Sequence, residues 1–147
     1  MSINSLNPYL NFDGTAAEAI AHYERTLDAR TEMVMRFGDV KEMPVAPEHA
    51  NRVMHATLQV GGGTIMISDG SPGSFVTAGG TTQVALHFSG DLDDMARKFT
   101  ALAEGGQVTM PLTDTFWGAR FGTLIDRFGI YWMFNGELPK DEKSREA

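Results

Sequence analysis

Two histidines stand where an imidazole could bind a cation or an organic ligand. His55 and His87 each lie in a run in which polar and apolar residues alternate, so both are expected on the polar face of a strand. A histidine at such a position more often packs or hydrogen-bonds in the wall of a site than ligates a metal. His22 is expected on a solvated helix face, and His49 lies in a loop without other candidate catalytic or metal-ligating residues around it. The ligand and wall interpretations of His55 and His87 both stay open.

The segment Thr115–Gly122 gathers aromatic rings and a cation around two glycines. Trp117 could stack on a planar ligand, and Arg120 could hold a carboxylate through two hydrogen bonds. Strict alternation turns Arg120 toward the helix side of its strand, so this role requires a bulge. The alternative is that these large side chains serve core and dimer contacts, with Phe121 in the core.

General acids, general bases and nucleophiles are poorly supported by the sequence. Asp69, Asp114 and Asp126 lie at strand ends or turns, where Asp commonly bonds to nearby backbone, so a structural role is expected for each. The chain has no Ser-His-Asp spacing signature and no phosphate-cradling loop. Because it has no cysteine, disulfides, thiolate metal ligands and a cysteine nucleophile are excluded.

An internal repeat organises these residues. The same offset separates Phe12 from Phe88 and Tyr23 from Phe99, and each segment reads as a strand, a helix and three further strands. The first strands are predicted over 7–12 and 83–88. The later strands are predicted over 31–37, 52–60 and 64–68 in the first unit and over 107–112, 119–126 and 130–135 in the second.

Helix signals separate the first and second strands of each unit. Thr15 and Glu18 have capping-box spacing, Asp91 offers an N-cap oxygen, and Gly105-Gly106 ends the second helix. Tyr23 and Phe99 lie on the apolar stripes and are expected in the core.

Alternation along the strands predicts a second, amphipathic face that points away from the helices. Aromatic rings with neutral hydrogen-bonding groups suit a small organic ligand better than a polyanion. The alternative is that this face meets only water or a dimer partner. The residues expected on it are Asn7, Tyr9, Asn11, His55, Thr57, Gln59, Gln83, His87, Tyr131, Met133 and Asn135.

Composition excludes several classes of partner. The 147 residues carry a formal net charge of −7, and basic residues do not cluster, which argues against nucleic-acid binding. No apolar stretch approaches the roughly 20 residues that span a bilayer, and the N-terminus lacks a signal-peptide pattern. We therefore expect a cytoplasmic protein without a membrane partner.

The repeat and a set of short motifs resemble the PhnB-like branch of the glyoxalase, bleomycin-resistance and dioxygenase (vicinal oxygen chelate) superfamily. This branch is also labelled 3-demethylubiquinone-9 3-methyltransferase-like. The resemblance implies an α+β fold in which two βαβββ units form an open, cleft-containing mixed β-barrel with helices outside, and it implies a homodimer. The motifs are Asn7-Pro8-Tyr9-Leu10, Phe12-x-Gly14, Arg52-Val53-Met54-His55-Ala56, Ser68-Asp69-Gly70, Phe116-Trp117-Gly118-Ala119-Arg120-Phe121-Gly122 and Asp126-Arg127-Phe128-Gly129-Ile130-Tyr131-Trp132-Met133.

The same resemblance bears on metal binding. Metal-using members of the superfamily hold a divalent cation at the first and last strands of each unit, which correspond here to Asn7 and Gln83 and to Ile67 and Met133. Ile67 and Met133 cannot ligate a hard cation, and two neutral amides hold one weakly. We therefore expect no metal cofactor. A divalent metal at a displaced site around His55, His87 or Gln83 is the alternative.

These observations lead to one domain over residues 1–147, with unit one at about 5–70, unit two at about 81–136 and a charged tail at 137–147. Residues 38–51 are a candidate lid and 69–80 a candidate linker. The expected function is metal-independent binding of a small, partly aromatic molecule. A divalent-metal-dependent lyase, isomerase or dioxygenase is one alternative, and a structural dimer with a filled cleft is another. The predicted ligand-binding residues are Asn7, Tyr9, His55, Gln83, His87, Trp117, Arg120 and Tyr131.

Overall fold

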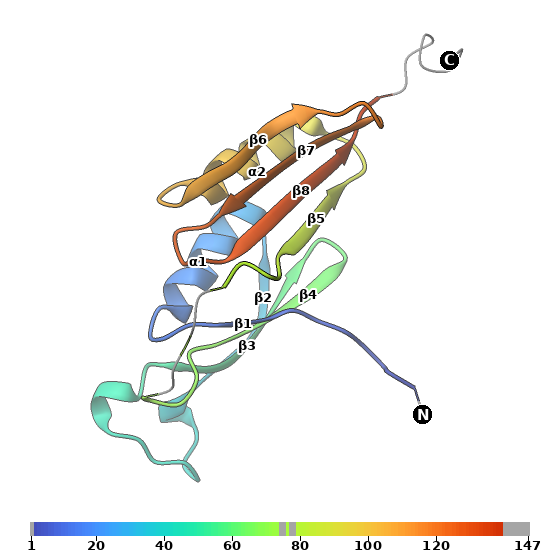
Figure 1. Cartoon of the computed structure of the whole chain (residues 1–147). Helices are drawn as coiled ribbons and strands as arrows, with labels where there is room; N and C mark the ends of the chain where they lie inside the picture. Colours follow the sequence, from blue (N-terminus) through green and yellow to red (C-terminus); the bar gives the residue numbers. More distant parts are fainter. Residues whose placement is uncertain (1, 74–75, 77–78, 140–147) are drawn as a thin grey trace. The chain divides into compact units, whose positions relative to one another are not determined.

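The computed structural model describes residues 2–73, 76 and 79–139 (Figure 1). The chain divides into two compact units, Met1–Ala78 and Gly79–Ala147. Both units contain a four-stranded mixed sheet and one α-helix, so the fold is α+β, as predicted. Among the described residues, no helix has the length and apolar character that a membrane crossing requires.

Unit 1 has the order β1, α1, β2, β3, β4. Its sheet runs β1-β4-β3-β2, with β1 parallel to β4 and the other neighbours antiparallel. Two short 3-10 helices, Phe37–Asp39 and Pro47–His49, lie between β2 and β3, and the first begins one residue before the candidate lid predicted over 38–51. The bounds are β1 Tyr9–Asn11, α1 Ala16–Leu27, β2 Arg30–Arg36, β3 Val53–Val60 and β4 Gly63–Ser68.

Unit 2 repeats this topology. Its sheet runs β5-β8-β7-β6, again with the first strand parallel to the last. The predicted βαβββ repeat is therefore confirmed, although neither sheet closes on itself. β8 extends to Glu137, the first residue of the predicted tail, and residues 140–147 lie outside the described residues. The bounds are β5 Val84–Phe88, α2 Leu92–Ala103, β6 Gln107–Asp114, β7 Ala119–Ile125 and β8 Tyr131–Glu137.

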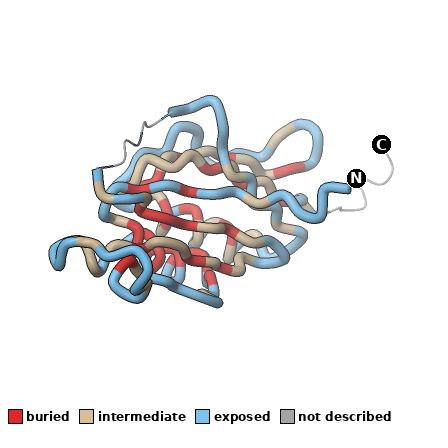
Figure 2. The backbone as a smooth tube through the Cα atoms, turned by 90° about the horizontal axis from the view of Figure 1, so that it is seen from below, coloured by how far each residue is buried: buried red, intermediate tan, exposed pale blue. Residues whose placement is uncertain are grey.

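Each unit has its core between its helix and one face of its sheet. Tyr23 and Phe99 are buried as predicted, Tyr23 in unit 1 and Phe99 in unit 2. The Phe99 ring meets Phe134 of β8 edge-on, with ring centroids 5.1 Å apart. Buried and half-buried positions alternate along the central strands (Figure 2), because alternate side chains of a strand point to opposite faces.

The two helices begin differently. Asp91 caps α2 as predicted, since its carboxylate accepts a hydrogen bond from Asp94 N at 3.1 Å. The capping box predicted for α1 is wrong, because the Thr15 side chain makes no capping bond. Asp69, at the end of β4, takes its place and accepts bonds from Gly14 N and Ala16 N at 2.8 and 2.9 Å. This cap comes from a residue far away in the sequence.

Two buried aspartates tie strand ends together, which confirms their predicted structural roles. Asp69 also accepts a bond from Val53 N at 2.9 Å, so it joins the start of β3 to the start of α1. Asp126 accepts bonds from two backbone N–H groups of the β7–β8 turn and from the indole N–H of Trp132. Carboxylates bonded in this way serve the fold, and neither stands free for catalysis.

Two further expectations are wrong. His22 is not on a solvated helix face, because only 2% of it is exposed and its Nδ1 lies 3.1 Å from Arg25 Nη2. The buried stripe of α1 is wider than its apolar residues suggest, since it includes Thr26 as well. Phe121 is only half-buried, and it pairs with Asn135 on the face of its sheet that points away from α2.

Candidate functional site

The face of sheet β1-β4-β3-β2 that points away from α1 carries the first candidate site. Ala56 and Leu58 of β3 are buried toward α1, so His55 and Thr57 point to the opposite face, where alternation predicts them. We call this surface the open face of unit 1, and it is made by Tyr9, Met33, Met35, His55, Thr57 and Met66.

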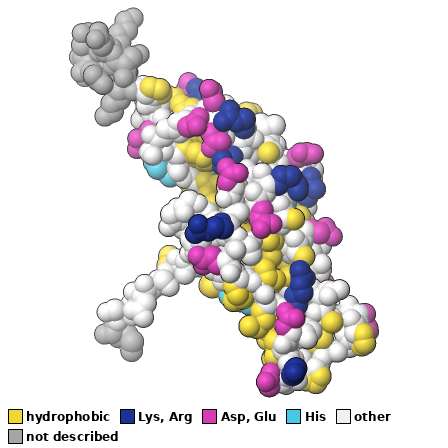
Figure 3. Space-filling model, turned by 180° about the vertical axis from the view of Figure 1, so that it is seen from behind, with side chains coloured by type: hydrophobic (Ala, Val, Ile, Leu, Met, Phe, Trp, Pro, Cys, Tyr) yellow, Lys and Arg dark blue, Asp and Glu magenta, His cyan; other side chains and the backbone are white. Residues whose placement is uncertain are grey.

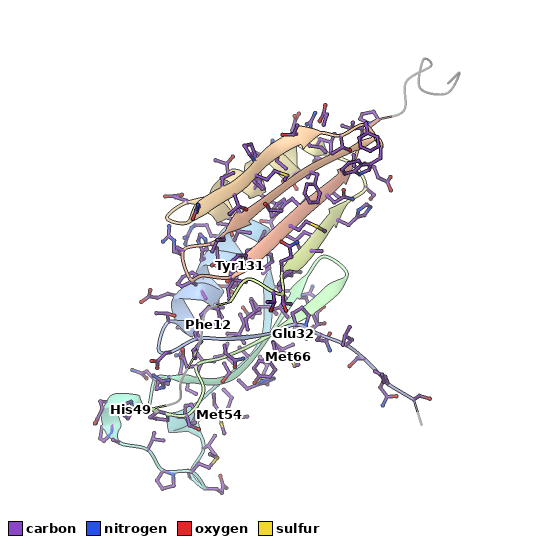
Figure 4. All side chains as sticks on the ribbon, viewed as in Figure 1. Phe12, Glu32, His49, Met54, Met66 and Tyr131 are labelled. Atoms are coloured by element: carbon purple, nitrogen blue, oxygen red, sulfur yellow. The ribbon has the colours of Figure 1, made fainter. Side chains whose placement is uncertain are left out.

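Strand register places these six residues in adjacent positions. Met66 of β4 is paired with Tyr9 of β1 on one side and with Thr57 of β3 on the other. Across the next ladder, Met33 of β2 is paired with Thr57 and Met35 with His55. Figure 4 labels Met66 on this sheet. Because directly paired side chains on one face are contact neighbours, these residues form a continuous surface.

A hydrogen-bonded pair lies at the polar centre of this surface. Tyr9 Oη is 2.9 Å from His55 Nδ1, and the two ring centroids are 5.6 Å apart at an interplanar angle of 52°. His55 Nε2 has Thr57 Oγ1 at 3.4 Å. The phenol fixes the orientation of the imidazole, and both rings remain accessible. Such a pair can hydrogen-bond a carbonyl or hydroxyl group, and the imidazole can accept a proton.

Unit 2 has a corresponding face with different chemistry. Register places Ala85 of β5 opposite Met133, and His87 opposite Asn135. Asn135 Nδ2 lies 3.1 Å from His87 Nδ1, and Glu137 Oε1 lies 3.5 Å from His87 Nε2. An exposed imidazole and a carboxylate therefore meet at one end of β8.

Tyr131, a predicted site residue on β8, is half-buried. It lies on the same face of the sheet as Met133 and Asn135. A side chain added at Gly80 would approach the Tyr131 ring within 3.2 Å, so the backbone at Gly80 lies against this ring.

Arg120 lies apart from these faces. It is paired with Gly136, where an added side chain would collide with Leu92 and Met95 of α2, so it points to the helix side as strict alternation predicts. Its guanidinium bonds Asp114 at 2.7 and 3.4 Å. This bond lowers the pKa of Asp114 and raises that of Arg120. The guanidinium that was predicted to bind a ligand carboxylate is therefore already paired with Asp114.

Trp117 lies in the turn between β6 and β7. It meets Phe116 edge-on, with ring centroids 5.0 Å apart, and 97% of Phe116 is exposed. The turn is held by Thr115, whose backbone N–H bonds the Ala119 carbonyl at 2.7 Å. Gly118 of this turn accepts a hydrogen bond from Leu138 N at 3.0 Å, so the turn lies beside the end of β8.

The positions that the family uses for a divalent cation do not fit one here. Ile67 is buried on the helix side of β4, and Met66 is the residue that faces Tyr9, as Met133 faces Ala85. The predicted correspondence was therefore displaced by one residue, which moves a side chain to the other face. Thioethers are poor ligands for hard cations. Within residues 2–73, 76 and 79–139, no three His, Cys, Asp or Glu side chains gather as a metal-binding group.

The two amides at the remaining family positions lie just before the first strands of the two units. Asn7 precedes β1 and donates to Ser5 Oγ at 3.3 Å, and Gln83 is exposed just before β5. Sequence reasoning missed Met33, Met35 and Met66 as surface residues of the site. The alternation of Met33 and Met35 along the predicted strand would have revealed two of them.

Comparisons with known proteins decide the family. Residues 5–134 match the model of the Glyoxalase/Bleomycin resistance protein/Dioxygenase superfamily. The chain belongs to this superfamily. Protein YjdN of Escherichia coli (strain K12) is 34% identical to it, and the match covers 88% of this chain and 93% of YjdN.

Solved structures of similar proteins have the same fold. The crystal structure of protein PA1353 from Pseudomonas aeruginosa is 39% identical with a TM-score of 0.80, covering 92% of this chain and all of PA1353. A PhnB protein from Bacillus cereus, titled a putative 3-demethylubiquinone-9 3-methyltransferase, is 24% identical with a TM-score of 0.71. That match covers 90% of this chain and 99% of the other, and it shows the shared fold.

Proposed function

We propose that this protein binds a small, partly aromatic organic molecule on the open face of unit 1, without a divalent metal. The hydrogen-bonded pair of Tyr9 and His55 carries the proposal, because it presents a phenol and an imidazole side by side on an accessible sheet face. Two of the predicted ligand-binding residues meet there.

The surroundings of the pair favour an uncharged ligand with an aromatic part. Met33 and Met35 lie on β2 and Met66 on β4, and thioether sulfur makes favourable contacts with ring edges. The six residues that define the open face include no Asp, Glu, Lys or Arg. A carbonyl or hydroxyl group on the ligand would bond the pair, while its ring would lie on the sulfur atoms.

We propose binding without turnover, because the resistance proteins of the family suggest sequestration. Sequestration needs only a ligand site. The proposal includes a cytoplasmic homodimer, as the resemblance to PhnB-like proteins implies. Asn7 remains proposed as a secondary ligand contact beside the open face of unit 1, while Gln83, Trp117 and Tyr131 remain proposed as ligand contacts within unit 2. Arg120 is no longer proposed as an anchor, because its guanidinium bonds Asp114.

The test is a thermal-shift screen of neutral aromatic carbonyl and phenol compounds, followed by titration of the hits. Tyr9→Phe keeps the ring and removes the hydroxyl, so affinity should fall about 2- to 10-fold, the equivalent of one hydrogen bond. Thr31→Val is the control, because it removes a hydroxyl that bonds Glu24 of α1 on the other side of the sheet, and it should bind as the wild type does. Equal losses in both variants, or none in Tyr9→Phe, would contradict the proposal.

A second candidate function rests on unit 2. His87 Nε2 and Glu137 Oε1 are 3.5 Å apart, so an imidazole and a carboxylate already meet beside the Asn135 amide. Such donors suit a borderline divalent cation, and a metal-dependent lyase, isomerase or dioxygenase would need one.

Elemental analysis of tag-free protein prepared without chelators tests the second candidate. The second candidate is favoured over metal-free binding if the protein carries near-stoichiometric Mg, Mn, Fe, Ni or Zn. That metal should be lost in His87→Gln and kept in the loop control His49→Gln. Protein without such metal supports the first proposal.

A further inference from the structure

Methionine sulfur is concentrated on the open face of unit 1. Met33 and Met35 lie on the edge strand β2, and each is 40% exposed although its side chain is apolar. Met66 lies two strands away on the same face. Both thioethers point to the face of the sheet opposite α1, on an edge strand that is exposed along most of its length.

Register shows that these sulfur atoms can converge on one imidazole. Met35 is directly paired with His55, and Met33 is paired with Thr57, the next residue of β3 on that face. Cβ atoms of directly paired residues are about 4.5–5.5 Å apart, and diagonal neighbours remain within reach of long side chains. Because a methionine side chain turns about three bonds, both sulfur atoms can approach the His55 ring.

We propose that Met33, Met35 and His55 form a binding site for monovalent copper, with Met66 as a further sulfur donor at its border. Thioether sulfur and imidazole nitrogen are soft or borderline ligands, and such ligands select Cu(I) over Mg²⁺, Ca²⁺ or Mn²⁺. The site lacks a carboxylate among its three ligands, so a hard cation gains little there. It also needs no cysteine, of which the chain has none.

Tyr9 completes the site by positioning the imidazole. A ligating histidine usually has its second ring nitrogen held by a hydrogen bond, which fixes the tautomer and the ring orientation. Tyr9 Oη holds His55 Nδ1 at 2.9 Å and leaves Nε2 as the ligating atom. Thr57 Oγ1, at 3.4 Å from Nε2, is a weak neighbour that a metal ion displaces easily.

Binding of copper is separate from the proposed binding of an organic molecule. The two share His55 and Tyr9, but the organic ligand uses Met33 and Met35 only as apolar contacts, which leucine can replace. A Met33→Leu/Met35→Leu double variant therefore loses the metal and keeps the Tyr9–His55 pair beside an apolar surface, so failure of one proposal does not imply failure of the other.

The experiment uses Ag(I) as a redox-stable probe and Cu(I) in competition with a chromophoric chelator. Methionine methyl groups are labelled with ¹³C and followed by NMR during titration of the full chain with Ag(I). The methyl signals of Met33 and Met35 should shift and saturate at one equivalent. Those of Met43 and Met110, which are 45% and 47% exposed and lie outside the site, should stay in place.

Variants make the test quantitative. Tyr9→Phe should weaken Cu(I) binding about 10-fold, the lower end of the effect of losing a partner of a ligating histidine. The Met33→Leu/Met35→Leu variant should weaken it further, while Met43→Leu/Met110→Leu should match the wild type. Leucine nearly conserves volume, so the fold should persist, and circular dichroism checks this. Equal shifts of all four exposed methyls, or titration without saturation, would overturn the proposal.

Discussion

Replacing Asp69 by Ala should destabilise unit 1 more than any surface substitution. The Asp69 carboxylate is 1% exposed and accepts bonds from Gly14 N, Ala16 N and Val53 N at 2.8 to 2.9 Å. The bonds to Ala16 and Val53 are buried, so water cannot replace the carboxylate there, whereas Gly14 N is only partly buried. An unsatisfied buried N–H group costs about 1–3 kcal/mol, which gives a total loss of about 3–5 kcal/mol.

Asp69→Asn separates the hydrogen bonds from the charge. Both bonds to the α1 end use Oδ1, which an amide oxygen can replace, but Val53 N would then face an amide N–H. We therefore expect Asn to cost about half as much as Ala, or about 1.5–3 kcal/mol.

Urea denaturation followed by two probes is the assay. Both tryptophans, Trp117 and Trp132, lie in unit 2, so their fluorescence reports that unit, while far-UV circular dichroism reports both. If the units unfold separately, Asp69→Ala should move the circular dichroism transition to lower urea before the tryptophan transition. A loss below about 1 kcal/mol would refute the reasoning, because it would mean that the three N–H groups find other partners.

Three further predictions concern the two cores and the surface. Tyr23→Ala and Phe99→Ala should each lower the free energy of unfolding by about 3–5 kcal/mol in urea titrations, because both rings are buried; losses below about 1 kcal/mol at both would show that the core is misplaced. Asp114→Asn should destabilise the protein at neutral pH, and its difference from the wild type should shrink as the pH falls below the ordinary carboxyl pKa of 3.8 toward the lowered pKa of Asp114; a difference that grows toward low pH would be inconsistent with the Arg120 ion pair. Gly106→Ala should lower the thermal midpoint and cost about 1–3 kcal/mol, since its Cβ would overlap the backbone at the end of β7; an unchanged midpoint would count against the packing there.

Much of the fold could be predicted because it follows local periodicity. Alternation alone placed His55 and Thr57 on the open face, and the repeat of Tyr23 at Phe99 located both helix cores. The cap of α1 could not be found locally, since Asp69 lies beyond three intervening strands in the sequence. A capping box is a local pattern, and a tertiary contact replaced it.

The site was less predictable because it depends on register. The pairing of Tyr9 with His55 joins β1 to β3 across β4, and no spacing in the sequence encodes that arrangement. A one-residue displacement put Ile67 where Met66 belongs, which hid the sulfur-rich surface. Arg120 attracted attention as a cation among aromatics, but its charge is met by Asp114.

The most direct test of the central claim is ¹⁵N NMR of the histidine rings during titration with a hit from the aromatic screen. His55→Gln and His87→Gln assign the two strand histidines. We predict that both ring nitrogens of His55 shift to saturation with the ligand, that the His87 signals stay in place, and that Tyr9→Phe reduces the His55 response. Shifts of His87 with an unchanged His55 would contradict a ligand site on the open face of unit 1.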